Sequence, residues 1–467
     1  MRNFQLVCST PPHLVVSDHE HPIFSFRTIK YILLWLLLWQ DNMVLGSPIQ
    51  IIERLVDTGA VHPLEVWLII CFLTLCLERI ISGNYELRRS YFWGPLLLMA
   101  LALVFSYIRG MLQLQEFRIV FEIHEAILLP VAYFVILNMF REPGEWRVLL
   151  VLLIFASIGK AFDGALIYFF SNYEKVQWGV LQLWRDGFLM AIGVLSTLLL
   201  FHYKGRSLMW LKRLLYWTTP VMLFTLIVSY RRTFFLAILV GCAAMIFLLP
   251  RERRAKQLLV IFGFIFAILI VVLATDPVGF FMRFFGAFNP DEEGSAYIRM
   301  MEYPNIFLNI YHNPIWGVPI GTFWHQYYRM PMYAVYTLYG CHNTYLYWQL
   351  RCGIPGTVAF WWFISRQWKA ALIQFRLTRN TEEKNFFAIL SILIMVVYHV
   401  ACMLGLLYAD GFIIMAVYMV ALQLMMESEL GLKSLRDVRL IPTLKHRRLV
   451  YWGEEASAQA VQTVSAS

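Results

Sequence analysis

Charged side chains are scarce in this sequence. Only 15% of the 467 residues are Asp, Glu, Lys or Arg, whereas 60% are apolar. Soluble domains average about 25% charged residues and contain under about 50% apolar residues. The composition therefore excludes a soluble enzyme of two or three domains and predicts an integral membrane protein.

Motifs that bind nucleotides or metals are also missing. No glycine-rich phosphate loop, internal repeat or low-complexity run occurs, so no nucleotide-binding domain is expected. The seven cysteines include no CxxC pair, which argues against a zinc site. Cys341 and Cys352 both fall near the outer face, where a disulfide and two buried thiols are alternatives. We expect neither a cofactor nor a metal.

Long apolar runs dominate the chain. Because they are continuous, whereas β-barrel strands would alternate in hydrophobicity, they predict an all-α polytopic helix bundle with about twelve transmembrane helices. A window of about 19 residues gives the spans. They are 28–46, 64–80, 91–108, 121–140, 147–169, 178–201, 214–230, 233–249, 257–275, 342–365, 386–407 and 411–426.

Basic residues fix the expected orientation. The net charge of +9 would favour a nucleic acid partner in a soluble protein, but most of the 39 Lys and Arg residues fall in alternate loops between the spans. The positive-inside rule then places both termini in the cytoplasm. We expect the membrane, and no nucleic acid, as a partner.

This topology divides the chain into five regions. They are a cytoplasmic segment (1–27), spans one to nine (28–275), a long extracytoplasmic loop (276–341), spans ten to twelve (342–426) and a basic cytoplasmic tail (427–467). The loop is too aromatic and apolar for disorder. We expect it to fold as short helices on the outer interface.

Ionisable residues within the spans gather toward the outer face. Such residues are costly in a bilayer, so they are paired or functional. The inner halves of the spans read as almost purely apolar, which predicts a polar chamber open to the outside. Its members are Glu65, Glu122, His124, Glu125, Lys160, Asp163, Arg185, Asp186, Arg351 and His399.

Several members have structural alternatives. Lys160 and Asp163, three residues apart on one helix, can neutralise each other, and Glu122 can pair with Arg118 in the same way. His399 is expected to be a satisfied core histidine. The partner of Arg185 lies on another helix or is a ligand.

A short turn joins spans seven and eight. Residues 229–233 read Ser-Tyr-Arg-Arg-Thr, so Arg231 and Arg232 lie at the outer boundary between two helices. Arginine forks bind phosphate bidentately, and the N-terminus of the next helix attracts anions. Interfacial snorkelling by two cationic turn residues is the alternative.

A second motif begins span ten. His342 and Asn343 open a stretch that continues to a Gly-Ile-Pro-Gly sequence at 353–356. The imidazole can accept a proton from a sugar hydroxyl or bind a phosphate, and the amide can cap the helix. A purely structural interfacial cap is the alternative.

In these stretches the sequence resembles the O-antigen ligase and polymerase superfamily of bacterial membrane proteins. Residues 229–233 are similar to its Ser-x-Ser-Arg turn, and 342–356 to its His-Asn-x-Tyr-Leu helix start. Between them, Arg299 and the segment 313–323, Asn-Pro-Ile-Trp-Gly-Val-Pro-Ile-Gly-Thr-Phe, are similar to its Arg…Pro-x-x-Gly-x-Gly loop. The resemblance covers roughly residues 215–365.

The resemblance implies an inverting glycosyltransferase on the outer face of the bacterial inner membrane. Its donor would be an undecaprenyl-pyrophosphate-linked glycan, and its acceptor a glycan or a lipid. Arg299 and either Arg231 or Arg232 would hold the donor pyrophosphate, and His342 would act near the transferred sugar. Arg185 and Asn343 are further candidates for substrate binding. Arg351 departs from the family pattern, and this change is expected to affect the acceptor.

Two other classes remain as alternatives. A transporter or flippase of lipid-linked sugars fits twelve spans, but it would need polar residues through the midplane and repeats, which the sequence does not display. A non-catalytic scaffold of a polysaccharide assembly complex would depend on aromatic surface and not on loop arginines. Ligase and polymerase cannot be separated from sequence.

Overall fold

The computed structural model describes most of the helical regions of the chain. The described residues are 26–39, 63–83, 85, 87–88, 90–113, 119–140, 142–170, 184–201, 203–229, 232–275, 294–330, 341–378, 381–404 and 409–430. Within these ranges every regular element is a helix and no strand occurs. The all-α prediction is confirmed for this part of the chain.

The helices follow one another in a simple order. They are α1 (Phe26–Trp39), α3 (Pro63–Ser82), α4 (Trp93–Leu112), α5 (Ile119–Met139), the 3₁₀ turn η1 (Pro143–Glu145), α6 (Trp146–Phe170), α8 (Trp184–Leu200), α9 (Met209–Val228), α10 (Arg232–Leu248), α11 (Arg251–Thr275), α13 (Gly294–His312), α14 (Thr344–Leu377), α15 (Glu382–Leu404) and α16 (Ala409–Leu430).

Each predicted span overlaps one of these helices. Five stretches within the described helices are long and apolar enough to cross a membrane. They are Trp93–Leu112, Pro143–Leu166, Met209–Val228, Glu382–Leu404 and Gly411–Glu429. The count of twelve spans stays a prediction, because the other helices are shorter or carry more charge.

The hydrophobic core surrounds α16. Every residue from Gly411 to Glu427 is buried. This helix packs against α5, α6, α14 and η1, which explains why it is apolar on all sides. Helices α3, α4 and α11 instead expose many large apolar side chains, as expected of surfaces that face lipid.

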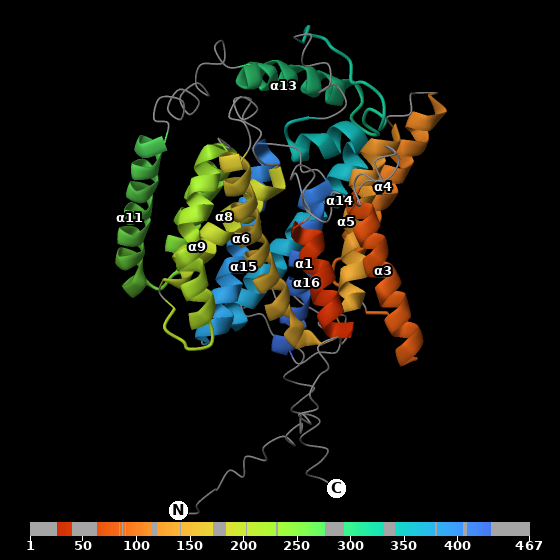
Figure 1. The fold of residues 1–467 in the computed structure, drawn as a ribbon. Helices are drawn as coiled ribbons and strands as arrows, with labels where there is room; N and C mark the ends of the chain where they lie inside the picture. The colour runs from red at the N-terminus through yellow and green to blue at the C-terminus, as the bar shows by residue number, and fades with distance from the viewer. Residues whose placement is uncertain are drawn as a thin grey trace, which may run out of the picture.

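Helix α13 lies across one end of the bundle (Figure 1), whereas α1 begins and α16 ends at the opposite end. It falls within the predicted loop 276–341 and has 19 residues, so the described part of this loop forms one longer helix in place of the short ones expected. Its residues Ile306 and Ile310 pack into a small separate core with Val318, Trp324 and Leu350. The outer layer thus has its own apolar anchor on α14.

The end opposite α13 contains buried polar side chains. Lys30 Nζ donates to Glu78 Oε1 at 3.1 Å and to the Met139 carbonyl at 2.6 Å. Arg88 forms an ion pair with the fully buried Glu427, whose other carboxylate oxygen accepts from Gln423 at 2.8 Å. Lys30, Glu78, Arg88 and Glu427 lie at the ends of the predicted spans or in segments predicted to be cytoplasmic, so the apolar character of the inner halves stays a prediction. Most of these polar groups hydrogen-bond one another, which offsets the cost of their burial, although Glu78 Oε2 has no hydrogen-bond partner among the described residues.

Candidate active site

The start of α14 is fixed by its first residues. Asn343 is the N-cap, and its side-chain oxygen accepts hydrogen bonds from the backbone N–H groups of Tyr345 and Leu346 at 3.0 and 3.1 Å. Its amide nitrogen donates to the Met403 carbonyl of α15 at 3.1 Å. The capping predicted from sequence is confirmed. Because both ends of the amide are engaged, Asn343 holds the preceding residue, His342, at a defined place beside α15.

Glu302 of α13 binds His342 through two hydrogen bonds. The backbone N–H of His342 donates to Oε1 at 2.9 Å, and ring Nδ1 lies 2.7 Å from Oε2. The Glu302 side chain is 0% exposed, whereas the His342 side chain is 35% exposed. The carboxylate is thus buried behind the ring, and the imidazole remains accessible.

This pair selects one tautomer of the imidazole. An ionised carboxylate can only accept hydrogen bonds, so Nδ1 carries the proton that it donates to Glu302. The other ring nitrogen, Nε2, then keeps its lone pair in the neutral ring. A carboxylate behind a histidine also stabilises the imidazolium that forms when Nε2 accepts a proton. The arrangement is that of an oriented general base.

Arg299 precedes Glu302 by three residues on α13, so the two side chains leave neighbouring turns of one helix face. Its Nε atom is buried and has no hydrogen-bond partner among the described residues. A buried guanidinium N–H without an acceptor is costly unless a ligand supplies one. Arg299 therefore offers a donor for an anion one helical turn from Glu302.

Tyr303 and Cys341, the chain neighbours of Glu302 and His342, are not suited to act as bases. Burial raises the pKa of the Tyr303 hydroxyl, which also hydrogen-bonds Asn343. Burial, together with the nearby Glu302 carboxylate, raises the pKa of the Cys341 thiol well above its ordinary value. Both groups stay protonated at neutral pH. His342 is therefore the group at this site suited to accept a proton.

Buried polar side chains of α4 and α14 hydrogen-bond the backbone of the loop after α13. Arg351 is fully buried, and its Nη1 donates to the carbonyls of Pro319 and Thr322 at 2.9 and 2.8 Å. Ser106 of α4 accepts from the Ile320 N–H at 3.1 Å. Arg351 thus shapes the loop, and any effect that it has on the acceptor must act through this shape.

Two glycines allow the same loop to touch α14. Gly317 and Gly353 have φ angles of 68° and 60°, and Gly353 breaks the helix. A Cβ on Gly353 would lie 2.1 Å from the carbonyl oxygen of Ile315. The break lets the Val318 N–H reach the Leu350 carbonyl at 2.6 Å. Glycine is required here because the backbone is left-handed and the chains are in contact.

The remaining basic candidates are less completely described. Arg231 lies outside the described residues, and Arg232 begins α10 with a half-buried side chain. Arg185 lies in the first turn of α8, but its side chain is outside the described part. At the start of α10, Phe234 lies against Gly187 of α8, and the adjacent Phe188 contacts Tyr398 near the end of α15 that binds Asn343. Arg232 and His342 are therefore at the same end of the bundle.

His399 is a satisfied core histidine, as predicted. Its Nε2 accepts from the Trp368 indole N–H at 2.6 Å, and its Nδ1 hydrogen-bonds the Tyr345 hydroxyl. Cys341 and Cys352 are buried free thiols, so the disulfide alternative is wrong. Glu122, His124 and Glu125 have side chains outside the described part, and their roles stay predictions. Lys160 is fully buried and Asp163 is half-buried on α6, and their mutual neutralisation stays a prediction.

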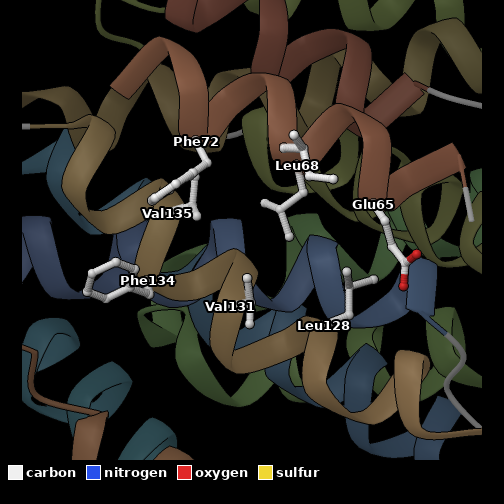
Figure 2. A pocket seen from close by; sticks show the side chains of 8 residues that line it. Glu65, Leu68, Phe72, Leu128, Val131, Phe134 and Val135 are labelled. Carbon is white, nitrogen blue, oxygen red and sulfur yellow. The ribbon is translucent and has the colours of Figure 1, made fainter. Parts of the chain in front are cut away.

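Glu65 lies at one end of an apolar groove between α3 and α5 (Figure 2). The groove has a volume of about 390 Å³. Leu68, Phe72, Val131 and Phe134 line its length. Half-exposed apolar side chains such as Ile69 border it, which is typical of a surface that an aliphatic lipid chain covers in a bilayer. This groove is separate from the Glu302–His342 pair.

Sequence reasoning missed Glu302. The residue lies in the loop and not in a span, so the argument from charges buried in the bilayer did not reach it. Its spacing of three from Arg299 was the available signal, since it places both on one face of any helix. Within the described residues, no group of three His, Cys, Asp or Glu side chains gathers as metal ligands.

The fold and the site define a membrane-type helical protein with a basic and histidine-containing site at one end of its bundle. Residues 217–361 match the family model described as O-antigen ligase. The resemblance seen in the motifs is thereby confirmed over this segment, which runs from α9 to the N-terminal half of α14. It includes Arg231, Arg232, Arg299 and His342, but not Arg185. Comparison with curated proteins gave no match.

Proposed function

We propose that the protein is a membrane glycosyltransferase of the O-antigen ligase or polymerase type. It transfers glycan from an undecaprenyl-pyrophosphate-linked donor to a glycan or lipid acceptor, on the outer face of the bacterial inner membrane, with both termini in the cytoplasm. The observation that carries this proposal is the Glu302–His342 pair, one helical turn from the buried donor of Arg299.

The donor chemistry needs charge stabilisation above all. When the bond between the anomeric carbon and the phosphate oxygen breaks, negative charge develops on the pyrophosphate. Fixed guanidinium donors stabilise this charge in a site of low polarity. Arg299 serves this role, together with Arg231 or Arg232 near the start of α10 and Arg185 near the start of α8. Helix N-termini supply further N–H donors.

The acceptor hydroxyl needs a base. His342 Nε2 takes the hydroxyl proton as the acceptor oxygen attacks the anomeric carbon, and the pyrophosphate leaves with the bonding electrons. A single displacement of this kind inverts the anomeric configuration. Glu302 stabilises the imidazolium that results, and Asn343 acts as a positioning residue through the helix cap. The reaction as drawn uses no metal.

The test is glycan transfer by the full-length protein in reconstituted membranes, with a radiolabelled undecaprenyl-pyrophosphate oligosaccharide. We expect His342→Ala to lower kcat by about 10²- to 10⁴-fold, the usual contribution of a general base. The matched control is Glu252→Gln, an exposed carboxylate of α11, which should retain activity. Transfer at the wild-type rate by His342→Ala would rule out the assigned base.

The same assay separates the two reaction types. A ladder of longer lipid-linked glycans from donor alone identifies a polymerase, whereas label that appears only on an added acceptor identifies a ligase. Arg299→Ala should suppress both products. If folded wild-type protein transfers nothing under either condition, the proposed function is wrong and the flippase alternative takes its place.

A further inference from the structure

A group of aromatic rings lies exposed on the outer layer, away from the Glu302–His342 pair. His312 stacks on Tyr327 with ring centroids 5.3 Å apart and an angle of 20°, and His325 meets Tyr327 edge-on at 4.5 Å. Tyr311 meets His312 at 5.4 Å. We name these four residues the outer aromatic platform. All four are exposed, and Tyr311 is 77% exposed.

The platform is held rigidly from below. Asn309 of α13 accepts from the His325 N–H at 2.8 Å and donates to the His325 carbonyl at 2.7 Å. One turn earlier, Asn305 binds the N–H and the carbonyl of Tyr328 at 2.8 and 3.0 Å. Both asparagines are buried. They therefore fix the backbone of residues 325–328 on α13, as a neighbouring strand would.

Buried apolar residues secure both ends of this segment. Trp324 is 1% exposed and Met330 is 5% exposed, and both belong to the small core under α13. The chain between them faces outward. Trp324 and Met330 already fill the space between this segment and α13. The exposed aromatic rings are therefore not needed for packing within the protein.

The chemistry of the platform suits a carbohydrate. Aromatic faces carry negative electrostatic potential, so they attract the polarised C–H face of a sugar ring. Tyrosine hydroxyls and imidazole nitrogens at the ring edges supply donors and acceptors for sugar hydroxyls. A membrane-interface belt is the competing explanation for exposed aromatics, but such belts consist of Trp and Tyr. Half of this platform is histidine.

Its location matches the proposed reaction. Glu302 and His312 are ten residues apart on one helix, which corresponds to about 15 Å along the helix axis. A short oligosaccharide spans this distance. A glycan whose first sugar lies at His342 can therefore extend along α13 and reach the platform.

We infer that the outer aromatic platform is a binding subsite for the carbohydrate chain, several sugars from the bond that reacts. This inference rests on the proposed function, because the distance to the reacting bond is measured from His342. The expectation that the platform binds a carbohydrate comes from its aromatic and polar groups alone. The chain that occupies the subsite belongs to the donor or to the acceptor, which present the same sugar surface.

The test uses the full-length protein in lipid nanodiscs. The probe is the lipid-free oligosaccharide released by mild acid from the lipid-linked glycans of the source cells. Saturation-transfer NMR should detect binding to wild type, and Tyr327→Ala should weaken it by about two- to tenfold, the range expected for loss of one aromatic contact. Tyr311→Ala is the second variant, since a side chain so exposed can be removed without disturbing the fold. Phe307→Ala, exposed on α13 outside the platform, is the matched control.

Transfer kinetics provide a separate readout. Tyr327→Ala should raise KM for donors with several repeat units and leave KM unchanged for a donor with one sugar, with kcat unaffected. If only the length of the acceptor matters, the occupant is the acceptor chain. Equal effects on short and long chains, an equal loss in Phe307→Ala, or unchanged glycan binding in both platform variants would overturn the inference.

The two proposals fail in different ways. If wild type binds the free glycan through Tyr327 but transfers nothing, the platform stands and the transferase proposal is wrong. If His342→Ala abolishes transfer but both platform variants behave as wild type, the transferase stands and the platform inference is wrong.

Discussion

The carboxylate of Glu302 decides which nitrogen of His342 carries the proton. It holds both the ring and the backbone N–H of the same residue, so it fixes the orientation as well as the tautomer. Full burial of the carboxylate excludes water, which would otherwise weaken the electrostatic interaction. At this scale the proposed reaction depends on a residue that acts through His342 and not by contact with the sugar.

Glu302→Gln tests this role. An amide can donate to Nδ1, which favours the opposite tautomer, and it no longer stabilises the imidazolium. We expect kcat to fall by at least about 10²-fold. The measurement is the rate of glycan transfer at saturating substrate, with Glu252→Gln as the control. A kcat equal to that of the wild type would show that Glu302 is only structural.

The element on which the site depends is α14. It begins at a capped N-terminus beside His342 and breaks at Gly353, where the loop after α13 enters. Arg351 and Ser106 then bind the backbone of that loop. The position of the base relative to the outer layer is therefore set by backbone contacts that tolerate no side chain at Gly353.

Gly353→Ala should disrupt this junction. The new Cβ would meet the Ile315 carbonyl oxygen, and the left-handed backbone would be strained. We expect a loss of roughly 1–3 kcal/mol in stability, measured as lower thermal stability in detergent, with reduced transfer activity. Gly263→Ala in α11 is the matched control, because nothing lies within 4 Å of its added Cβ. Equal stability of the two variants would contradict the proposed contact.

At the scale of the whole molecule, the two ends of the bundle differ. One end has a closed network of ion pairs around Lys30, Arg88 and Glu427, and the other has α13 and an accessible imidazole. This asymmetry favours a site reached from one side only. A transporter would need a polar path that opens to both sides.

Labelling of single cysteines tests the orientation. On a background without the native cysteines, Tyr311→Cys should react with a membrane-impermeant maleimide in intact cells. Arg251→Cys, at the exposed start of α11, should react only after the membrane is permeabilised, because the positive-inside rule places it in the cytoplasm. The reverse pattern would invert the topology and place the proposed site on the wrong side of the membrane.

Much of this molecule could be predicted from the sequence. Continuous apolar runs located the membrane-type helices, although α14 extends to Leu377, well beyond the predicted end of its span at 365. The asparagine before α14 predicted the helix cap, and the histidine beside it is the proposed base. Glu302 was not predicted, because it contacts a residue 40 positions away in the chain, and hydropathy gives no information on such contacts. The polar network at the end opposite α13 was not predicted for the same reason, because its members lie far apart in sequence and meet only after folding.

The asparagine pair on α13 has an evolutionary consequence. Asn305 and Asn309 hydrogen-bond only main-chain atoms of this segment. These hydrogen bonds therefore do not depend on which side chains stand at positions 325, 327 and 328. Descendant sequences are then free to exchange these three residues while the scaffold and the reacting groups stay the same. If the outer aromatic platform binds the carbohydrate chain, exchanges in this short stretch would change the preferred glycan and leave the proposed catalytic residues unaltered.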